Sequence, residues 1–350
     1  MKKIIYFTFG LAITLASCDK DKDKDKDKDK DKDKQWITPP NAGSTMTLNG
    51  GAREEVAENS VFVDFSANEQ ESIKRSAWHL AFNCGSEFGV FLNSTNISRA
   101  KEAVGINIDD VISETDLEPY ATALGMVMGG EVGPSMDIVD AFDKSITGTV
   151  IKDGKTYMYR NEDAAQPLYK IKVAKKDDNT YTVSYALWNS SEVKSADIRK
   201  DSKYSMVGFS LIDEKTVVVE KPTWDILWGR NTYMSAMAPG VPSAMADVVF
   251  INNKGGVKAA EIMEENIAYD NYTEADLTST VLSSDVGAIG DKWRGTGGMP
   301  PKMSLKTDRY YIVQDIAGNV YKLKFLAIGV DDGAVRGYPQ IKFDLVKAVQ

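Results

Sequence analysis

Two tryptophan-centred stretches decide the fold: Trp78-His-Leu-Ala-Phe82 and, much later in the chain, Trp224-Asp-Ile-Leu-Trp228. Each follows a strand-like segment that ends in Phe-Ser, and each precedes an apolar run that ends in Asn. Shared landmarks in one order at similar spacing predict two tandem copies of one unit, residues 36–200 and 201–350. The alternative is that strand-rich sequences resemble one another without any duplication.

Strand patterns continue outward from these two stretches. Period-two alternation of apolar and polar residues marks five segments, which are 61–65, 169–173, 181–185, 321–325 and 341–345. Segments 216–220 and 248–251 are continuous apolar runs, as in strands covered on both faces. Helical patterning is brief and lies chiefly near 99–104 and 258–265. The sequence therefore predicts a mainly β protein with short helices, built as two antiparallel units.

Composition narrows the class of function. The 350 residues carry 42 basic and 51 acidic side chains, a net charge of −9 that argues against nucleic acid as a partner. His79 is the single histidine, and no nucleophile elbow, zinc-binding helix motif, Walker loop or dinucleotide fingerprint occurs, so we do not expect an enzyme. With only Cys18 and Cys84 there is no disulfide framework.

The pattern of the N-terminal residues is typical of a targeting segment. Two lysines precede a short apolar run, which predicts a signal peptide over residues 1–17. The break at Leu15-Ala-Ser-Cys18 resembles the lipobox of bacterial lipoproteins, which implies cleavage before Cys18 and its acylation. An ordinary signal peptide with an incidental cysteine is the alternative. Residues 18–35, mostly an alternation of Asp and Lys, predict a solvated tether between an outer-membrane lipid anchor and a globule at the cell surface.

The second tryptophan stretch extends to Arg230 and carries a more specific resemblance. Together with Asp315-Ile-Ala-Gly-Asn-Val-Tyr-Lys-Leu-Lys-Phe325 and Gly337-Tyr-Pro-Gln-Ile-Lys-Phe343, it resembles the HmuY family of surface haem-binding lipoproteins. The resemblance implies a mostly β fold whose loops clasp one haem. It further implies two axial ligands, either histidines or methionines, and delivery of haem or a related porphyrin to an outer-membrane uptake receptor.

The resemblance also indicates where ligands would lie. Because the family's histidines are absent and His79 lies inside a strand motif, methionine remains as the donor, a soft and neutral thioether. The matching positions are Met128, Met136, Met158 and Met299, and among them Met136 and Met299 are expected to hold the iron. Met237 or Met245, from an inserted segment, can substitute for a first ligand. Trp293 and Tyr233 are expected as pocket walls, and Arg294 or Arg230 as a cation for the propionates.

Other interpretations stay open. Methionine is a common gap-filler in hydrophobic cores, so any one of these residues can be purely structural. Tyrosine and tryptophan also suit a surface module that binds a glycan or a partner protein. A third interpretation is a family fold that has lost haem and serves as a scaffold.

Overall fold

The computed structural model describes residues 40–51, 57–96, 98–123, 151–161, 167–233, 243–297 and 302–349. Pro40–Gln350 group as one compact unit. Most of its described secondary structure belongs to four large antiparallel sheets, joined by one short α-helix and four 3-10 turns. The predicted mainly β class is confirmed.

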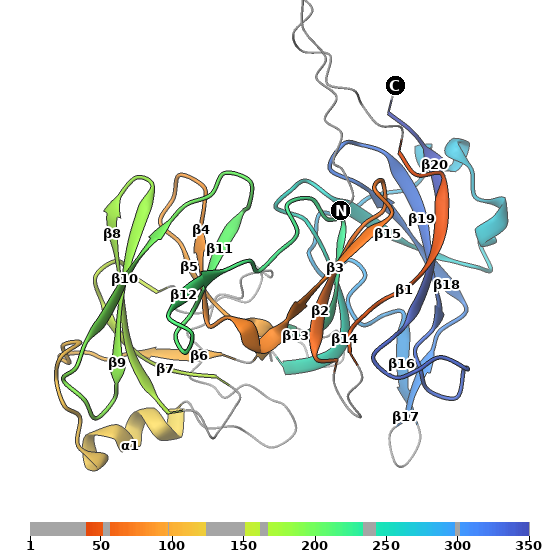
Figure 1. Ribbon diagram of the computed structural model, residues 1–350. Helices are drawn as coiled ribbons and strands as arrows, with labels where there is room; N and C mark the ends of the chain where they lie inside the picture. Colours follow the sequence, from red (N-terminus) through yellow and green to blue (C-terminus); the bar gives the residue numbers. More distant parts are fainter. Residues whose placement is uncertain are drawn as a thin grey trace, which may run out of the picture. The chain divides into compact units, whose positions relative to one another are not determined.

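The four large sheets form two pairs, each with a five-stranded outer sheet and a four-stranded inner sheet (Figure 1). The first outer sheet, in spatial order, holds β10 (Lys194–Arg199), β9 (Thr180–Leu187), β8 (Tyr169–Asp177), β7 (Thr156–Arg160) and β6 (Arg99–Glu102). The first inner sheet holds β12 (Lys215–Val217), β11 (Met206–Ser210), β4 (Leu80–Asn83) and β5 (Val90–Leu92). We call this pair the first sandwich.

The second sandwich has the same make-up. Its inner sheet holds β14 (Ser243–Ile251), β13 (Ile226–Tyr233), β2 (Asn59–Asp64) and β3 (Glu69–Lys74). Its outer sheet holds β1 (Gly43–Thr47), β20 (Gln340–Lys347), β19 (Val320–Ala327), β18 (Arg309–Gln314) and β15 (Lys258–Met263). A separate two-stranded hairpin, β16 (Arg294–Gly297) and β17 (Lys302–Leu305), precedes β18.

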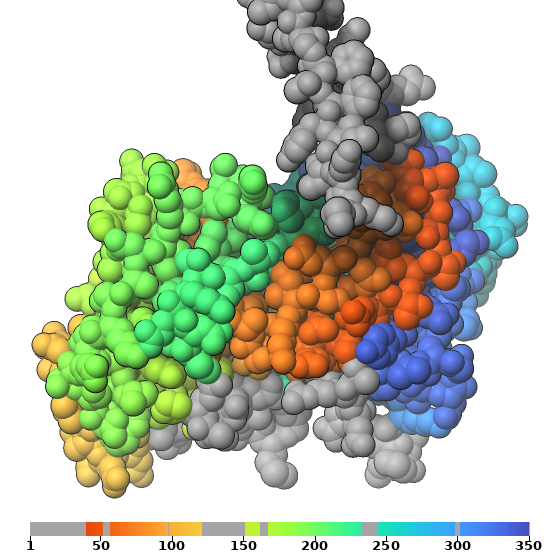
Figure 2. Space-filling model, in the orientation of Figure 1, coloured from red at the N-terminus to blue at the C-terminus, as the bar shows by residue number. Residues whose placement is uncertain are grey.

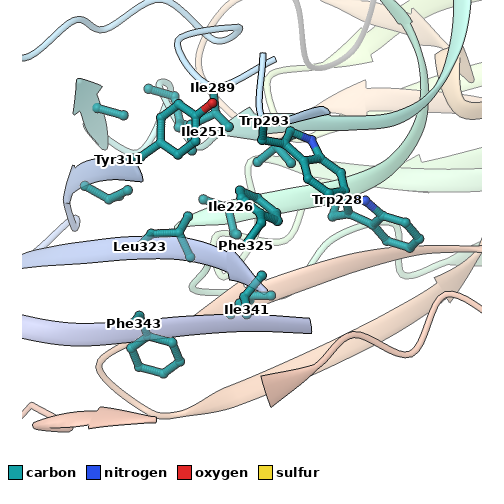
Figure 3. Packing of buried hydrophobic residues seen from close by; sticks show 14 of the residues in the cluster. Ile226, Trp228, Ile251, Ile289, Trp293, Tyr311, Leu323, Phe325, Ile341 and Phe343 are labelled. Atoms are coloured by element: carbon teal, nitrogen blue, oxygen red, sulfur yellow. The ribbon is translucent and has the colours of Figure 1, made fainter. Parts of the chain in front are cut away.

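Three hydrophobic cores lie between successive sheets. One fills the first sandwich and a second fills the second sandwich, where Trp228, Phe325 and Ile341 pack together (Figure 3). The third core joins the two inner sheets, because strand alternation sends Phe62 and Leu227 to the face opposite their neighbours. Burying both faces of an inner sheet explains the continuous apolar run at the end of β14.

Connections cover the outer faces of both outer sheets. In the first sandwich the segment that includes α1 (Glu114–Ala123) packs over Met158 and Leu168. In the second sandwich the segment with η3 (Tyr269–Asn271) and η4 (Glu274–Thr278) packs over Tyr310 and Ile312. No helix among the described residues has the length and apolar character needed to cross a membrane.

The strands predicted from period-two alternation and at 248–251 are found, but segment 216–220 is only partly a strand, because the edge strand β12 ends at Val217 and Val218 is 48% exposed. Both predicted helices are wrong. Residues 99–104 and 258–265 instead supply β6 and β15, which pair with β7 and β18. Each is the edge strand of an outer sheet, where pairing with a neighbour outweighs the helix propensity of Ala, Lys and Glu. The one α-helix among the described residues, α1, lies where no helix was predicted.

The predicted boundary at residue 200 does not divide the structure. Strand β1 pairs with β20, β2 pairs with β13, and β11 pairs with β4, so three of the large sheets take strands from both sides of that boundary. Figure 2 shows the red and orange N-terminal strands packed beside the blue C-terminal ones. The first sandwich is a continuous stretch that contains β4 to β12, and the second closes around it with β1 to β3 and β13 to β20. A simple tandem arrangement is not confirmed.

The two sandwiches nevertheless contain equivalent hydrogen bonds at matching positions. Asn93 Nδ2 donates to the carbonyl of Trp78 at 2.7 Å, and Asn252 Nδ2 donates to that of Trp224 at 3.0 Å. One residue after each tryptophan, a side chain accepts a buried backbone N–H from the turn that follows a paired strand. His79 Nδ1 accepts from Leu211 at 3.1 Å, and Asp225 Oδ2 accepts from Phe65 at 2.7 Å. These bonds establish which positions of the two sandwiches correspond. The 3-10 turns η1 (Arg75–Ala77) and η2 (Ser94–Asn96) lie near the crossover between them.

Candidate functional site

A cluster of buried polar contacts holds the base of the β16–β17 hairpin against β14. Trp293 Nε1 donates to the carbonyl of Asp247 at 3.0 Å, and Arg294 Nε donates to the same oxygen at 3.3 Å. Arg294 Nη2 also donates to the carbonyl of Ala246 at 2.7 Å. Both side chains are almost fully buried, so the hairpin begins from a fixed position on β14.

Asp247 is the centre of this cluster, which we call the Asp247 anchor. Its two carboxylate oxygens accept from the two Nη atoms of Arg336 at 2.7 and 2.5 Å, and the Asp247 side chain is 1% exposed. A bidentate pair of this kind fixes orientation as well as distance. Arg336 Nη2 also contacts the sulfur of Met303 on β17 at 3.5 Å. The anchor therefore joins β14, the hairpin and the β19–β20 connection.

The backbone at Asp247 is unusual for a strand. Its φ is +56°, a left-handed value that aspartate tolerates better than most residues. The pairing of β13 with β14 also shifts register between Gly229 and Asn231. Such irregularities redirect a strand end and are frequent next to functional sites.

Two chain segments with predicted haem ligands leave from strands joined at this anchor. Residues 234–242, with Met237, connect β13 to β14, and residues 298–301, with Met299, connect β16 to β17. Both segments lie outside the described residues, so the structure places their bases but not these methionines. Met128, Met136 and the proposed lipid-bearing Cys18 lie outside the described residues as well.

Two of the proposed methionines are described, and both pack in hydrophobic clusters. Met158 on β7 is fully buried against Ala103 and Leu168 beneath the α1 segment. Met245 on β14 is half-buried against the core between the inner sheets. Both placements match the gap-filling role of methionine.

The residues expected to line a haem pocket have other structural roles. Trp293 is 1% exposed and stacks on Phe325 with ring centroids 4.2 Å apart, so it is a core residue and not a pocket wall (Figure 3). Arg294 donates to the backbone carbonyls of Asp247 and Ala246. Its expected role as a cation for the propionates is therefore wrong. Arg230 is half-buried and already has a partner, and the side chain of Tyr233 is not described.

His79 and Cys84 flank strand β4 (Leu80–Asn83), and neither is suited to bind iron or to react. His79 is 1% exposed, and its Nδ1 lone pair accepts the Leu211 N–H, so that nitrogen is not available to iron. Cys84 is half-buried, and burial raises the pKa of its thiol, which disfavours the reactive thiolate.

The described residues by themselves do not make a haem site. Within them, no group of three or more His, Cys, Asp or Glu side chains is arranged to hold a metal ion. Their proposed thioethers lie in separate clusters, one in the first sandwich and one between the inner sheets. Met158 and Met245 therefore do not form a pair of axial donors with each other.

Asp247 and Arg336 are the residues of this site that sequence reasoning missed. The available signal is that Asp247 lies directly before the apolar run Val248-Val-Phe-Ile251, since aspartate is depleted in strands. Arg336 carries no such signal, because its connection looks like an ordinary Gly- and Asp-rich turn.

Comparison with known proteins identifies the family. The family model described as HmuY protein matches residues 57–343, most of the chain. This chain belongs to the HmuY family. One match spans strands of all four large sheets, so the family unit here covers both sandwiches. No curated protein matches the chain.

Two solved structures from Bacteroides are also similar. A candidate HmuY-like heme-binding protein from Bacteroides vulgatus ATCC 8482 has 9% identity, covers 88% of this chain and 94% of its own, and has a TM-score of 0.23. A candidate lipoprotein from Bacteroides fragilis NCTC 9343 has 11% identity, covers 51% and 95% respectively, and has a TM-score of 0.22. Neither score carries an argument beyond the family match.

Proposed function

We propose that this chain is a surface lipoprotein that binds haem or a related porphyrin for uptake, with methionine as axial ligand. Membership of the HmuY family is the observation that carries this proposal. The absence of a second histidine anywhere in the sequence, and the structural role of His79, favour thioether over imidazole ligation.

The Asp247 anchor indicates which methionine segments supply the axial ligands. Because hydrogen bonds from the side chains of Trp293 and Arg294 fix the start of the β16–β17 hairpin to β14, the Met237 and Met299 segments are the ones we propose to supply ligands. Fixing the bases of two binding loops lowers the ordering entropy that binding must overcome. Met128 and Met136 are the alternative donors for one of the two positions.

A thioether also sets the expected behaviour of the site. Bound haem supplies iron with open axial positions and a flat apolar ring. A methionine sulfur is neutral and loses no proton on binding, so ligation has little direct dependence on pH. Soft sulfur donors further favour ferrous over ferric iron.

The proposed location follows from the N-terminus. Acylation of Cys18 would anchor the chain in the outer membrane, and the Asp-Lys tether would hold the globule away from the lipid. An outer-membrane receptor that accepts the haem is the partner this arrangement implies.

The test is a haem titration of the purified chain, in the oxidised and reduced states, followed by the Soret band. We expect a sharp low-spin spectrum, weakened by Met299→Ala and by Met237→Ala. Met263→Ala is the matched control, because Met263 is half-buried at the end of β15, away from the Asp247 anchor. No spectral shift in either redox state refutes haem binding. An unchanged spectrum in both loop variants refutes the ligand assignment.

A further inference from the structure

The two sandwiches differ at one matched end. In the second sandwich this end is closed by Phe65, Tyr321 and Phe343, all fully buried. The Phe65 ring lies 5.6 Å from that of Tyr321 and 4.8 Å from that of Phe343, and the last two are 6.0 Å apart. Three aromatic rings at these separations fill the end of the sandwich.

The corresponding residues of the first sandwich are Leu211, Tyr169 and Tyr185. Leu211 matches Phe65, because each donates its backbone N–H to the side chain of the residue that follows the tryptophan, Trp78 in one sandwich and Trp224 in the other. The strand registers match the other two: Ile171 pairs with Tyr185 as Leu323 pairs with Phe343, and Tyr169 and Tyr321 each lie two residues earlier on their strands. A leucine therefore occupies the position that a phenylalanine fills in the other sandwich.

A hollow of about 340 Å³ lies at this end of the first sandwich, and we call it the Tyr169 hollow. Small-molecule sites span roughly 300–1,000 Å³, so the hollow has the size of a small one. Tyr185 and Leu211 form its buried floor, whereas Leu187 and Ile212 are 40% and 49% exposed at its edge. Exposed apolar side chains beside an aromatic floor are suited to a ligand with an apolar face.

The rim of the hollow is polar and fixed. Lys194 of β10 forms an ion pair with Glu214, next to β12, so the pair spans the two sheets beside the hollow. On another side, the buried Lys170 Nζ donates to the carbonyl of Ser190 at 2.8 Å, and the Ser190 hydroxyl accepts from the backbone N–H of Glu192 at 3.0 Å. The β9–β10 connection is therefore held in place beside the hollow.

The charges of the lining select the chemistry of the ligand. Two carboxylates, Glu192 and Glu214, face one ammonium, Lys194, so the lining carries a net charge of −1 and disfavours anions. Burial raises the pKa of Tyr169 and of Tyr185, so both phenols stay protonated at neutral pH and remain able to donate. A wholly apolar ligand would strip water from the carboxylates without replacing their hydrogen bonds.

We propose that the Tyr169 hollow binds a neutral saccharide. One C–H face of a pyranose ring lies against Tyr169, Leu187 and Ile212, and its hydroxyls donate to the carboxylates of Glu192 and Glu214. This site is separate from the proposed haem site, since its residues belong to β8, β9, β10, the β9–β10 connection and the β11–β12 turn, and none belongs to the Asp247 anchor.

The experiment is methyl NMR of the full chain, labelled at Ile, Leu and Val and titrated with maltose, lactose, cellobiose and diacetylchitobiose. We expect at least one of the four to shift the signals of Leu187 and Ile212. Leu211→Phe copies the closed end of the second sandwich, and we expect it to abolish those shifts while haem binding and thermal stability are retained. Val281→Phe is the control for added bulk, because Val281 is 88% exposed and lies outside the hollow.

Glu192→Gln provides a second variant at an exposed position that tolerates the change. Loss of a charge-assisted hydrogen bond should weaken saccharide binding about tenfold. Three results overturn the proposal: no shift with any of the four saccharides, binding that survives Leu211→Phe, or shifts caused by choline and by none of the sugars.

Discussion

Removing Arg336 should be among the most damaging single changes near the hairpin. Arg336→Met keeps an unbranched apolar stem and leaves the Asp247 carboxylate, 1% exposed, without its two charged donors. Breaking a buried ion pair from one side costs about 3–5 kcal/mol, whereas an exposed pair contributes about 0–1 kcal/mol. Because the Arg336 side chain is only 17% exposed, we expect the loss to fall in the first range.

The matched variant is Asp247→Asn, which keeps an oxygen acceptor and a residue that tolerates the φ of +56°. We expect it to cost about 1–3 kcal/mol, and the double variant to lose less than the sum of the single losses. Urea unfolding at neutral pH gives all three free energies. A loss below about 1 kcal/mol for Arg336→Met, the value of an exposed pair, would refute the stabilising role assigned to this buried ion pair.

Three further predictions concern the two sandwiches. Burial, followed by repulsion from Asp64 and Asp315, raises the pKa of Asp225, so the folded chain holds this proton more tightly than the unfolded chain. Asp225→Asn should therefore raise the free energy of unfolding at pH 7. This gain should shrink as the pH falls toward the ordinary carboxyl range. Gly50→Ala places a Cβ 2.3 Å from the Trp228 ring and should cost about 1–3 kcal/mol in denaturant melts, whereas Gly297→Ala, with open space around its Cβ, should be nearly neutral. His79→Phe leaves the buried Leu211 N–H without an acceptor and should cost about 1–3 kcal/mol, while His79→Asn, which restores an oxygen, should lose less; equal losses would contradict the assigned bond.

The strands of this fold are predictable because their patterns are local. Segments such as 169–173 and 321–325 alternate with period two, and they lie inside β8 and β19 as expected. The edges of the outer sheets are not predictable in this way. Residues 99–102 and 258–263 carry helix-forming side chains, and only pairing with β7 and β18 makes them strands.

The interleaving of the two sandwiches also escapes local reasoning. The tryptophans and the Asn that ends each apolar run identify corresponding positions, and the bonds of Asn93 and Asn252 agree with them. The Phe-Ser landmarks do not correspond, because Phe65 matches Leu211 and not Phe209. Whether the β2–β3 hairpin pairs with β4 or with β13 depends on long-range strand pairing. The sequence of the hairpin itself does not indicate which strand it pairs with. The predicted division at residue 200 failed for that reason.

The candidate site shows the same limit. Methionines are visible in the sequence, but Met158 looks no different from Met299 until the packing around it is known. Asp247 and Arg336 lie far apart in the chain and meet only because the β19–β20 connection reaches β14. An ion pair between residues that meet only in the tertiary structure cannot be predicted from their spacing in the sequence.

X-ray absorption at the iron edge of the haem-loaded chain tests the central claim most directly. Methionine ligation predicts a sulfur neighbour bound to iron in the native chain and its loss in Met299→Ala, with the Met263→Ala spectrum unchanged. A first coordination shell made of nitrogen and oxygen alone would contradict thioether capture of haem by this protein.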